Sequence, residues 1–451
     1  MFGKRSAVIL FAVALSSVVL LTQLMDRNVP GKNAPASGNG ANLPADPDIS
    51  RQTDAPRKLK VIVSMSPDEF FTLQKMNQVF ERQHAEITVT LENITDRNVY
   101  ARMKESAAAG LADIFLLDNA WVSEFAALGL LAPEPEAVAA GNTDSRPFDQ
   151  LLAQVKWNGF SWGIPKEAEL YVLIWSKKAF SDNRIGQPPQ TPAELLQVNQ
   201  KFAEANGAFS GIYVNPADPY AFLTLAWYMR AQSAEDSGAQ AAAEAAGELG
   251  PLASLYFPDG KAAGILKNYY PGTNDFDPWE LLASGEMPMM VGKASDYLRH
   301  LSDATALQPF NAAKDKEGDS APVLTGKSYV VSAYTDDAQT AFSWIYEAVS
   351  AQYEEAALQE AQILPALQHV FGEHSRLYGG ILPGLRQAIA SGVALAGNPD
   401  LPAKLAATEQ AAAAFYAGGS PWPQLAEEFD RLWQAQAERQ KPQPAGNSAE
   451  N

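Results

Sequence analysis

The stretch LADIFLLDNAWVSEFAALGLL, residues 111–131, gives the clearest indication of the fold class. Its apolar run, Ile114–Leu117, has the length and composition of a buried strand. Asp118, Asn119 and Trp121 follow directly, and the apolar residues after them recur at helical spacing. The pattern predicts a strand that ends in an acid, an amide and an indole before a helix begins.

Two strand–helix pairs come before this stretch and predict a parallel sheet. Residues 58–64 and 86–92 have strand patterns, and a helix is expected from about 97 to 109. After the first strand, Ser66 is placed to cap a helix, and Glu69 would complete a capping box with it. The succession of strand, helix, strand, helix and strand is typical of a doubly wound α/β sheet.

Open sheets of this type bind ligands beyond the carboxyl ends of their strands. Asp118, Asn119 and Trp121 stand at one such end, and Ser66 and Asp68 stand at another. These side chains are therefore candidates for a ligand site. In the alternative interpretation, Asn119 only caps a helix on which Trp121 is a core residue, and the pattern leaves both open.

The composition limits the classes of partner. The 451 residues carry a net charge of -18 and include no cysteine. Nucleic-acid binding is disfavoured, because phosphates must be neutralised by Lys and Arg, whereas a neutral or cationic ligand remains possible. The absence of cysteine excludes disulfides, thiol catalysis and thiolate metal sites. The length predicts two domains or one large two-lobed body.

The N-terminal sequence predicts export. A basic start, MFGKR, precedes twenty uncharged and mostly apolar residues with no clear cleavage site after them. We expect residues 1–25 to be a membrane anchor, with a cleaved signal peptide as the alternative. Residues 26–57 are predicted to be a disordered linker and 438–451 a disordered tail. The protein is then expected on the outer face of the cytoplasmic membrane, or periplasmic or secreted if the signal is cleaved.

Familiar cofactor motifs are missing from the sequence. The GKS at 326–328 lacks the glycine that a phosphate loop needs at position 321. His369 and His374 do not form a zinc motif, and no nucleophile elbow or dinucleotide motif occurs. A ferric-iron site at Tyr269 and Tyr270 is possible, but the pair is better explained as packing. No cofactor and no metal are expected.

Glu167 and Glu169 are two residues apart on a predicted strand and therefore share one face. A glycosidase also uses two carboxylates, but they flank the scissile bond. Neighbours on one strand are poorly placed for that arrangement. Ligand binding is the preferred interpretation, with a solvated surface as the alternative.

Together these segments resemble the family 1 extracellular solute-binding proteins of ABC importers, the group that contains the maltodextrin-binding proteins. The resemblance covers residues 58–437. It rests on four segments, which are residues 112–134, NGFSWGIPKEAELYVLIWSKKAF (158–180), LLASGEMPMMVGKASDYL (281–298) and ILPALQHVF (363–371).

The resemblance implies an α/β fold of the two-lobed periplasmic-binding-protein type (type II-like). Each lobe would be a sheet flanked by helices, and a ligand cleft would lie between the lobes at a hinge. The implied first lobe comprises 58–166 plus 305–350, and the second comprises 167–304 plus 351–437. The hinge crossings would fall near 165–168, 302–308 and 350–353.

Site residues follow from the resemblance one position at a time. Glu169 matches an acid that binds sugar hydroxyls in maltodextrin binders. Asp118, Asn119 and Trp121 occupy the first-lobe loop that faces the ligand, and Ser66 and Asp68 occupy the loop after the first strand. Ser295, Asp296 and Tyr297 occupy the element in which maltodextrin binders place a stacking tryptophan, so this chain departs from a long-maltodextrin site there.

The remaining candidates are aromatic and polar residues near strand ends. Trp227 is the further tryptophan expected in the cleft, whereas Trp175 and Trp344 stand in apolar runs and are expected in the core. Asn215 and Asp218 are weaker candidates at a strand end.

The sequence therefore predicts a monomeric solute-binding protein, not an enzyme, that captures a small solute and delivers it to an ABC permease. A carbohydrate is the expected ligand. The alternatives are a ligand-sensing adaptor for a membrane receptor, a binder of a polyamine or metal complex and, least favoured, a glycosidase.

Overall fold

The computed structural model describes residues 57–135, 146–205, 211–233, 249–257, 277–309, 323–374 and 376–439. All of them fall within one compact unit, Asp54–Asn451. The expected anchor, almost all of the linker, and Tyr269 and Tyr270 lie outside the described residues. Among the residues that are described, no helix is both long enough and apolar enough to cross a membrane.

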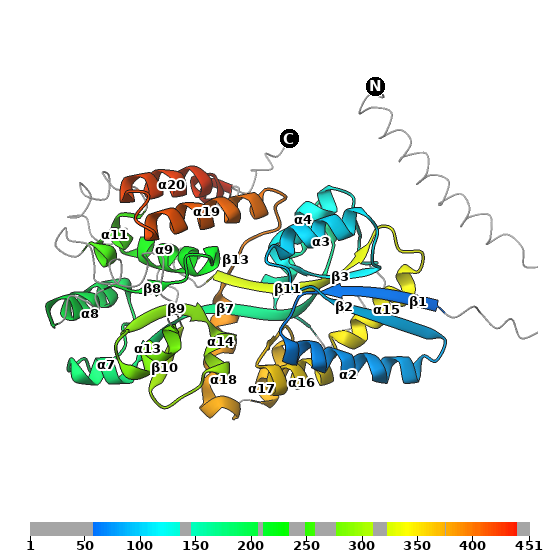
Figure 1. The fold of residues 1–451 in the computed structure, drawn as a ribbon, viewed down its shortest axis with the longest axis horizontal. Helices are drawn as coiled ribbons and strands as arrows, with labels where there is room; N and C mark the ends of the chain where they lie inside the picture. The colour runs from blue at the N-terminus through cyan, green and yellow to red at the C-terminus, as the bar shows by residue number, and fades with distance from the viewer. Residues whose placement is uncertain are drawn as a thin grey trace, which may run out of the picture. The chain divides into compact units, whose positions relative to one another are not determined.

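Three parallel strands form the start of the sheet, as the sequence predicts. They are β1 (Arg57–Val63), β2 (Ile87–Asn93) and β3 (Ile114–Asp118), and β1 lies between the other two. Helices α2 (Pro67–Gln83), α3 (Val99–Ala108) and α4 (Asn119–Ala127) connect and cover them (Figure 1). The predicted linker ends one residue too late, because Arg57 is already in β1.

The start of α2 differs from the predicted capping box. The Ser66 hydroxyl accepts a hydrogen bond from the backbone N–H of Glu69 at 3.3 Å, so Ser66 is the N-cap. The Glu69 side chain is buried and is an ion-pair partner of Lys166. Only half of the capping box is therefore formed, because the Glu69 carboxylate pairs with the Lys166 ammonium instead of with the backbone N–H of Ser66.

The thirteen-residue strand β7 (Ile164–Ser176) is shared by two sheets. Its residues 164–170 pair with β11 (Val323–Ser332), which lies antiparallel beside β3. Its residues 171–175 pair with β9 (Met289–Lys293), and its last five residues pair with β10 (Thr305–Pro309). We call the sheet on the β11 side the first-lobe sheet and the sheet on the β9 side the second-lobe sheet.

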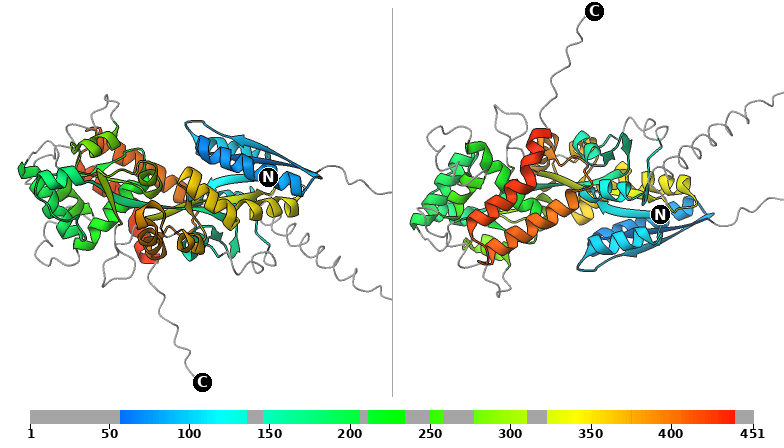
Figure 2. Two further views of the ribbon diagram at one scale, coloured as in Figure 1. Left: turned by 90° about the horizontal axis from the view of Figure 1, so that it is seen from below. Right: turned by 90° about the horizontal axis from the view of Figure 1, so that it is seen from above.

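Helices cover both faces of the second-lobe sheet. Helix α9 (Pro219–Ser233) packs with α19 (Leu401–Tyr416), and α19 packs with α20 (Trp422–Arg439), an arrangement seen in Figures 1 and 2. The strand β8 (Tyr213–Val214) extends this sheet. The other helices of this half are α7 (Lys177–Asp182), α8 (Pro192–Ala205), α11 (Gly250–Tyr256), α13 (Pro278–Ser284), α14 (Ala294–Arg299) and α18 (Ile381–Ser391).

Helix α16 (Ala351–Ala361), which the prediction assigned to the second lobe, packs on α2. The remaining elements are β4 (Leu131–Ala132), α6 (Asp149–Gln154), β5 (Lys156–Trp157), β6 (Phe160–Ser161), α15 (Ala338–Ala348), β12 (Leu364–Pro365), α17 (Gln368–Glu373), η4 (Leu377–Gly380) and β13 (Val393–Ala394). Helix α20 extends to Arg439, two residues into the predicted tail.

Candidate functional site

A hydrogen bond between Tyr220 and Asp118 connects the two halves of the molecule. Asp118 ends β3 and caps α4, where one of its oxygens accepts from the N–H of Ala120 at 2.9 Å. Tyr220 is the second residue of α9, and its hydroxyl donates to Oδ1 of Asp118 at 3.0 Å. Burial raises the pKa of Asp118, although the Tyr220 hydrogen bond and nearby lysines oppose the rise. Asp118 is thus a ligand candidate that already has a partner from the opposite side.

Tyr171 and Asp218 extend this contact on the second-lobe side. The Tyr171 hydroxyl lies 2.9 Å from both carboxylate oxygens of Asp218, and the Tyr171 and Tyr220 rings are 6.1 Å apart. Asp218 also accepts from the backbone N–H of Tyr220 at 3.2 Å, so it fixes the start of α9. Asn215, the companion candidate, is exposed and accepts from the N–H of Ala217 at 3.0 Å within its own turn.

Lys293, at the end of β9, is under the electrostatic influence of several acidic groups. It is opposite Tyr171 in the strand register, and its ammonium is 6.0 Å from the centre of that ring. Burial lowers the pKa of Lys293, but four carboxylates outweigh this effect and raise it. They belong to Asp218, Glu169, Asp296 and Asp118. The site therefore combines an excess of carboxylates with tyrosine rings and one central ammonium.

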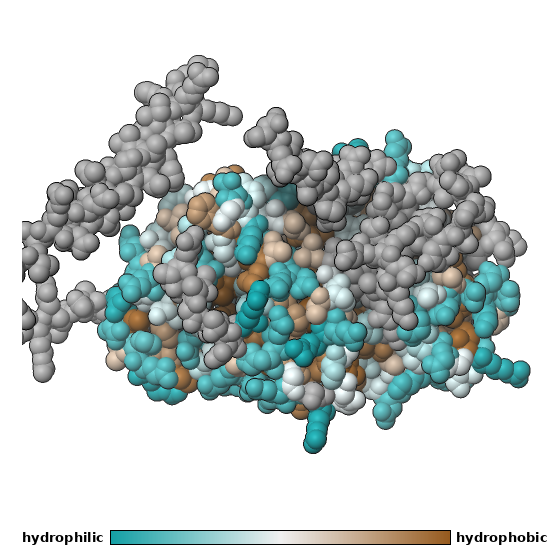
Figure 3. Space-filling view, turned by 180° about the vertical axis from the view of Figure 1, so that it is seen from behind, coloured by the Kyte–Doolittle hydropathy of each residue, from teal (hydrophilic) through white to brown (hydrophobic). Residues whose placement is uncertain are grey.

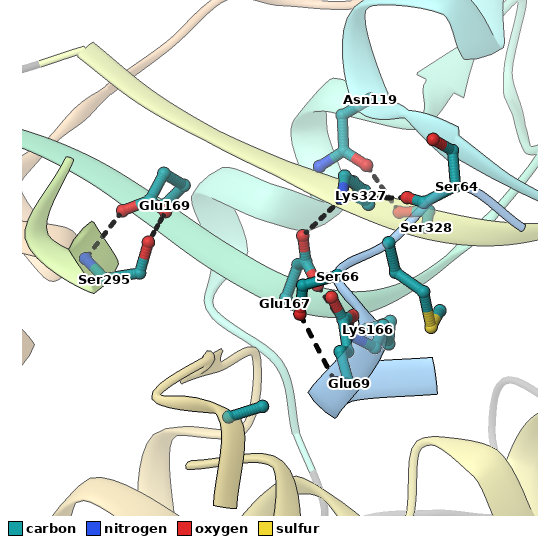
Figure 4. Close-up of polar contacts among 12 residues, drawn as sticks. Ser64, Ser66, Glu69, Asn119, Lys166, Glu167, Glu169, Ser295, Lys327 and Ser328 are labelled. Atoms are coloured by element: carbon teal, nitrogen blue, oxygen red, sulfur yellow. Dashed lines mark hydrogen bonds and ion pairs between the residues drawn. The ribbon is translucent and has the colours of Figure 1, made fainter. Parts of the chain in front are cut away.

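Glu169 contacts the start of α14 (Figure 4). The backbone N–H of Ser295 donates to its Oε1 at 3.3 Å, and the Ser295 hydroxyl donates to its Oε2. Burial raises the pKa of Glu169 to about 7, against the opposing charge of Lys293. The structure thus brings together two predicted site residues, Glu169 and Ser295, as partners of each other.

Asn119 is held by protein groups alone in the described structure. Its amide nitrogen donates to Gln154 at 2.7 Å, and its amide oxygen accepts from the Ser328 hydroxyl at 2.6 Å. The residue is 2% exposed. This geometry favours the structural interpretation of Asn119, because both ends of its side chain are already satisfied. The structural alternative expected Asn119 to be the N-cap of the helix, whereas Asp118 is the N-cap of α4.

The two tryptophan candidates lie in different environments. Trp121 is half-buried, its ring is edge-on to Tyr100 at 5.3 Å, and it packs between two hydrophobic cores. Trp227 packs edge-on against Trp433 of α20 at 5.5 Å, within the core around α9. Trp344 is fully buried, as predicted, whereas Trp175 is only half-buried.

The other predicted residues are distributed over three environments. Ser66 and Asp68 are exposed at the start of α2. Asp296 pairs with Arg299 on the same helix turn. Tyr297 is buried, and its hydroxyl donates weakly to the Thr305 carbonyl at 3.5 Å.

Tyr171, Tyr220 and Lys293 were not among the site residues predicted from the sequence. Tyr171 stands two residues after Glu169 on β7, so the same alternation that paired Glu167 with Glu169 places Tyr171 on their face. Lys293 lies two residues before Ser295, in the segment that carried the family resemblance. Both signals were available in the sequence, but Tyr220 becomes visible only when α9 is placed opposite β3.

A small hollow lies beside the Asp118–Tyr220 contact. It is lined by Asp118, Asn119, Ala120, Gln154, Tyr220, Leu324, Thr325, Leu395 and Leu401. It has room for about one water molecule. A solute larger than water therefore requires the two sides to move apart at this point.

A buried ionic network lies nearby on β7 (Figure 4). The Lys166 ammonium contacts Glu69 and, at 2.6 Å, Glu167, while Lys327 lies 3.4 Å from the other oxygen of Glu167. Burial would raise the pKa of Glu167, but the charges of Lys166 and Lys327 hold it at about 2. These charges are paired with one another, which indicates a structural role where β7 passes α2.

Comparison with known proteins identifies the family. The model of the family described as bacterial extracellular solute-binding protein matches residues 75–373. The chain belongs to this family. The solute-binding protein is also 26% identical over 158 residues to the maltotriose-binding protein of Pyrococcus abyssi, a match that covers 34% of this chain and about a third (33%) of that relative.

Solved structures of similar fold cover most of the chain. The GacH receptor of Streptomyces glaucescens, solved unliganded and with acarbose, has a TM-score of 0.64 at 20% identity, covering 84% of this solute-binding protein and 99% of that chain. Maltose-bound MalE3 of T. maritima has a TM-score of 0.65 at 16% identity, again covering 84% and 99%. The predicted family and its two-lobed α/β fold are confirmed.

Proposed function

We propose that this solute-binding protein captures a carbohydrate between its two lobes and delivers it to an ABC permease. The observation that carries the proposal is the set of carboxylates and tyrosines at the junction of the two sheets. Asp118 comes from the first-lobe sheet, and Asp218 and Tyr220 face it from the second-lobe side. Glu169 lies on the strand that both sheets share.

These groups suit a polyhydroxylated ligand. Sugar hydroxyls donate strong hydrogen bonds to carboxylates, and aromatic rings can cover the apolar faces of a sugar. The relatives whose names mention maltotriose, maltose and acarbose support this assignment. The stacking tryptophan expected of a maltodextrin binder is replaced by Ser295, so we favour a short saccharide or a polyol.

Binding would be coupled to closure of the lobes. The Tyr220–Asp118 hydrogen bond joins the two sides. A solute that bridges the same two sides would favour the closed state by its differential affinity for that state. We propose that the closed form is recognised by a permease, and that an N-terminal anchor keeps the protein near it.

We further propose that the protein is not a glycosidase. Glu167 is neutralised by Lys166 and Lys327, and Glu169 is bonded to Ser295. A catalytic pair needs one carboxyl on each side of the scissile bond, whereas these two residues follow one another on a single strand. On the part of the molecule's face that Figure 3 colours, hydrophobic side chains are interspersed among hydrophilic ones.

A cationic solute is the second candidate. The charges of four carboxylates raise the pKa of Lys293, and an additional positive charge on the ligand would offset more of this negative charge. This possibility keeps polyamines and amino sugars among the compounds to be tested.

The proposal is tested by a thermal-shift screen of the full chain against monosaccharides, short maltodextrins, polyols and polyamines. A ligand that binds only the folded state adds about 2.7 kcal/mol of stability at 100 times its Kd. We expect a saccharide or polyol to raise the Tm, and Glu169→Gln and Asp218→Asn to reduce that shift. Asp182→Asn, which removes an exposed carboxylate, is the control.

A shift produced only by polyamines would contradict the carbohydrate assignment. Turnover of a chromogenic glycoside that is lost in Glu169→Gln would contradict the binding role. If no compound raises the Tm, the carbohydrate proposal also fails and the adaptor alternative gains support.

A further inference from the structure

Helices α16 and α17 bring three potential metal ligands together away from the ligand site. Glu355 is on α16, Glu373 is the last residue of α17, and His374 follows it. One ligand atom from each of the three side chains lies within 4.8 Å of the other two. The imidazole Nε2 of His374 is 3.5 Å from Oε1 of Glu355.

The backbones that carry these ligands are fixed to one another. Before α17, the N–H of Leu367 donates to the Glu354 carboxylate at 2.9 Å. Beyond α17, the Tyr378 hydroxyl donates to the carbonyl of Leu358 on α16 at 2.7 Å. The two ties lie on either side of the cluster, so they hold the backbones of Glu355 and His374 near one another.

One imidazole nitrogen, Nε2 of His374, is buried and has no hydrogen-bond partner among the described residues. It faces Glu355 at ion-pair distance without hydrogen-bond geometry. A buried ring nitrogen aimed at a carboxylate can be satisfied by a cation between them or by protonation of the ring.

The donor set fits a first-row transition metal. Imidazole nitrogen and carboxylate oxygen bind Zn²⁺ at about 2.0–2.2 Å, and tetrahedral ligands at such distances are about 3.3 Å apart. The His374–Glu355 separation is already close to this value. The Glu355 side chain is 30% exposed and Glu373 is exposed, so both carboxylates can rotate towards the ion.

We propose that Glu355, Glu373 and His374 form a binding site for a divalent transition metal of the zinc type, completed by water. The two carboxylates balance its charge. The ion would cross-link α16 to α17 and is separate from the proposed solute site. The sequence shows no metal motif here because Glu355 on α16 and His374 after α17 are too far apart in the chain for a short motif.

The test uses the untagged full chain, stripped with EDTA and titrated with Zn²⁺ and Co²⁺. We expect one Zn²⁺ per chain, and visible Co²⁺ absorption of a four-coordinate site. Both should be lost in His374→Ala and weakened about tenfold or more in Glu355→Gln. His369→Ala, which changes a histidine of α17 five residues before His374, is the matched control and should bind as the unmodified protein does. Circular dichroism without metal verifies that each variant is folded.

Stoichiometric binding that survives both His374→Ala and Glu355→Gln would overturn the proposal, because the ion would then lie elsewhere. Failure of the unmodified chain to bind Zn²⁺ at about 100 μM would also overturn it. The His374–Glu355 contact would then be an ordinary ion pair.

Discussion

The Tyr220 hydroxyl of α9 lies 3.0 Å from Oδ1 of Asp118 at the end of β3 and donates a hydrogen bond to it. The acceptor belongs to the first-lobe sheet, and the donor covers the second-lobe sheet. The same acceptor caps α4. One carboxylate therefore both starts a helix of one lobe and holds the other lobe against it.

We expect Tyr220→Phe to favour a more open ligand-free protein. The substitution removes a hydrogen bond to a carboxylate that is worth about 1.5–3 kcal/mol. Small-angle X-ray scattering should show a larger radius of gyration, and the affinity for the solute should change. Tyr334→Phe, which changes a tyrosine that is 56% exposed, is the control. An unchanged scattering curve for Tyr220→Phe would show that this bond does not hold the lobes together.

The free energy of unfolding should depend on pH because of Glu169. Its folded pKa of about 7 is above the ordinary value of 4.5. Folding thus favours the protonated form of Glu169. Its stabilising contribution to the free energy of unfolding is complete below about pH 4.5 and is lost as the pH rises through 7. Glu169→Gln mimics the protonated form, so we expect it to match the unmodified protein at pH 4.5 and to be more stable by about 1–3 kcal/mol at pH 8.

This prediction is measured by urea unfolding at several pH values, with Asp182→Asn as the background variant. If the difference between Glu169→Gln and the unmodified protein does not vary with pH, the carboxyl is not protonated in the folded state as described.

Breaking the ionic network on β7 should be strongly destabilising. Lys166→Met removes the ammonium that pairs with the buried carboxylates of Glu69 and Glu167, and leaves Glu167 only its pair with Lys327. Loss of one partner of a buried pair costs about 3–5 kcal/mol. Lys178→Met breaks an exposed pair with Asp182 and should cost less than about 1 kcal/mol. Equal losses in the two variants, measured by thermal unfolding, would contradict the assigned burial.

Two glycines should respond to alanine in opposite directions. A Cβ at Gly326 on β11 would lie 2.2 Å from the Glu167 carbonyl of β7, so Gly326→Ala must push the two strands apart. We expect a loss of about 1–3 kcal/mol, as for other overpacked sites. A Cβ at Gly384 in α18 meets nothing within 4 Å, and Gly384→Ala should stabilise by about 0.5–1 kcal/mol. A chemical unfolding series measures both, and a stable Gly326→Ala would show that β11 and β7 can separate.

The fold could be predicted further than the site. Apolar runs and helix spacing over residues 57–132 identify three parallel strands, because burial imposes those periods on the sequence. The second-lobe sheet was harder, because β8 is only two residues long. The pairing of β11 between β3 and β7 joins segments far apart in the chain, and no local pattern records it.

For the site, Asp118 and Glu169 were identified by their positions on strands, but their partners were not. Tyr220 contacts Asp118 across 102 residues of sequence, and Ser295 contacts Glu169 across 126. Asn119 had the right residue type for a ligand and the right position, yet Gln154 and Ser328 occupy its amide. Residue type predicts what a side chain can bind, whereas the tertiary structure determines which partner it contacts.

The sharing of β7 makes the two lobes inseparable as expression units. If the lobes were produced separately, Ile164–Ser176 could belong to only one of them. The sheet of the other lobe would then have an unpaired edge. Any division of this protein for biosensor or split-protein engineering should therefore cut elsewhere, at an exposed loop such as the Asn158–Gly159 turn between β5 and β6.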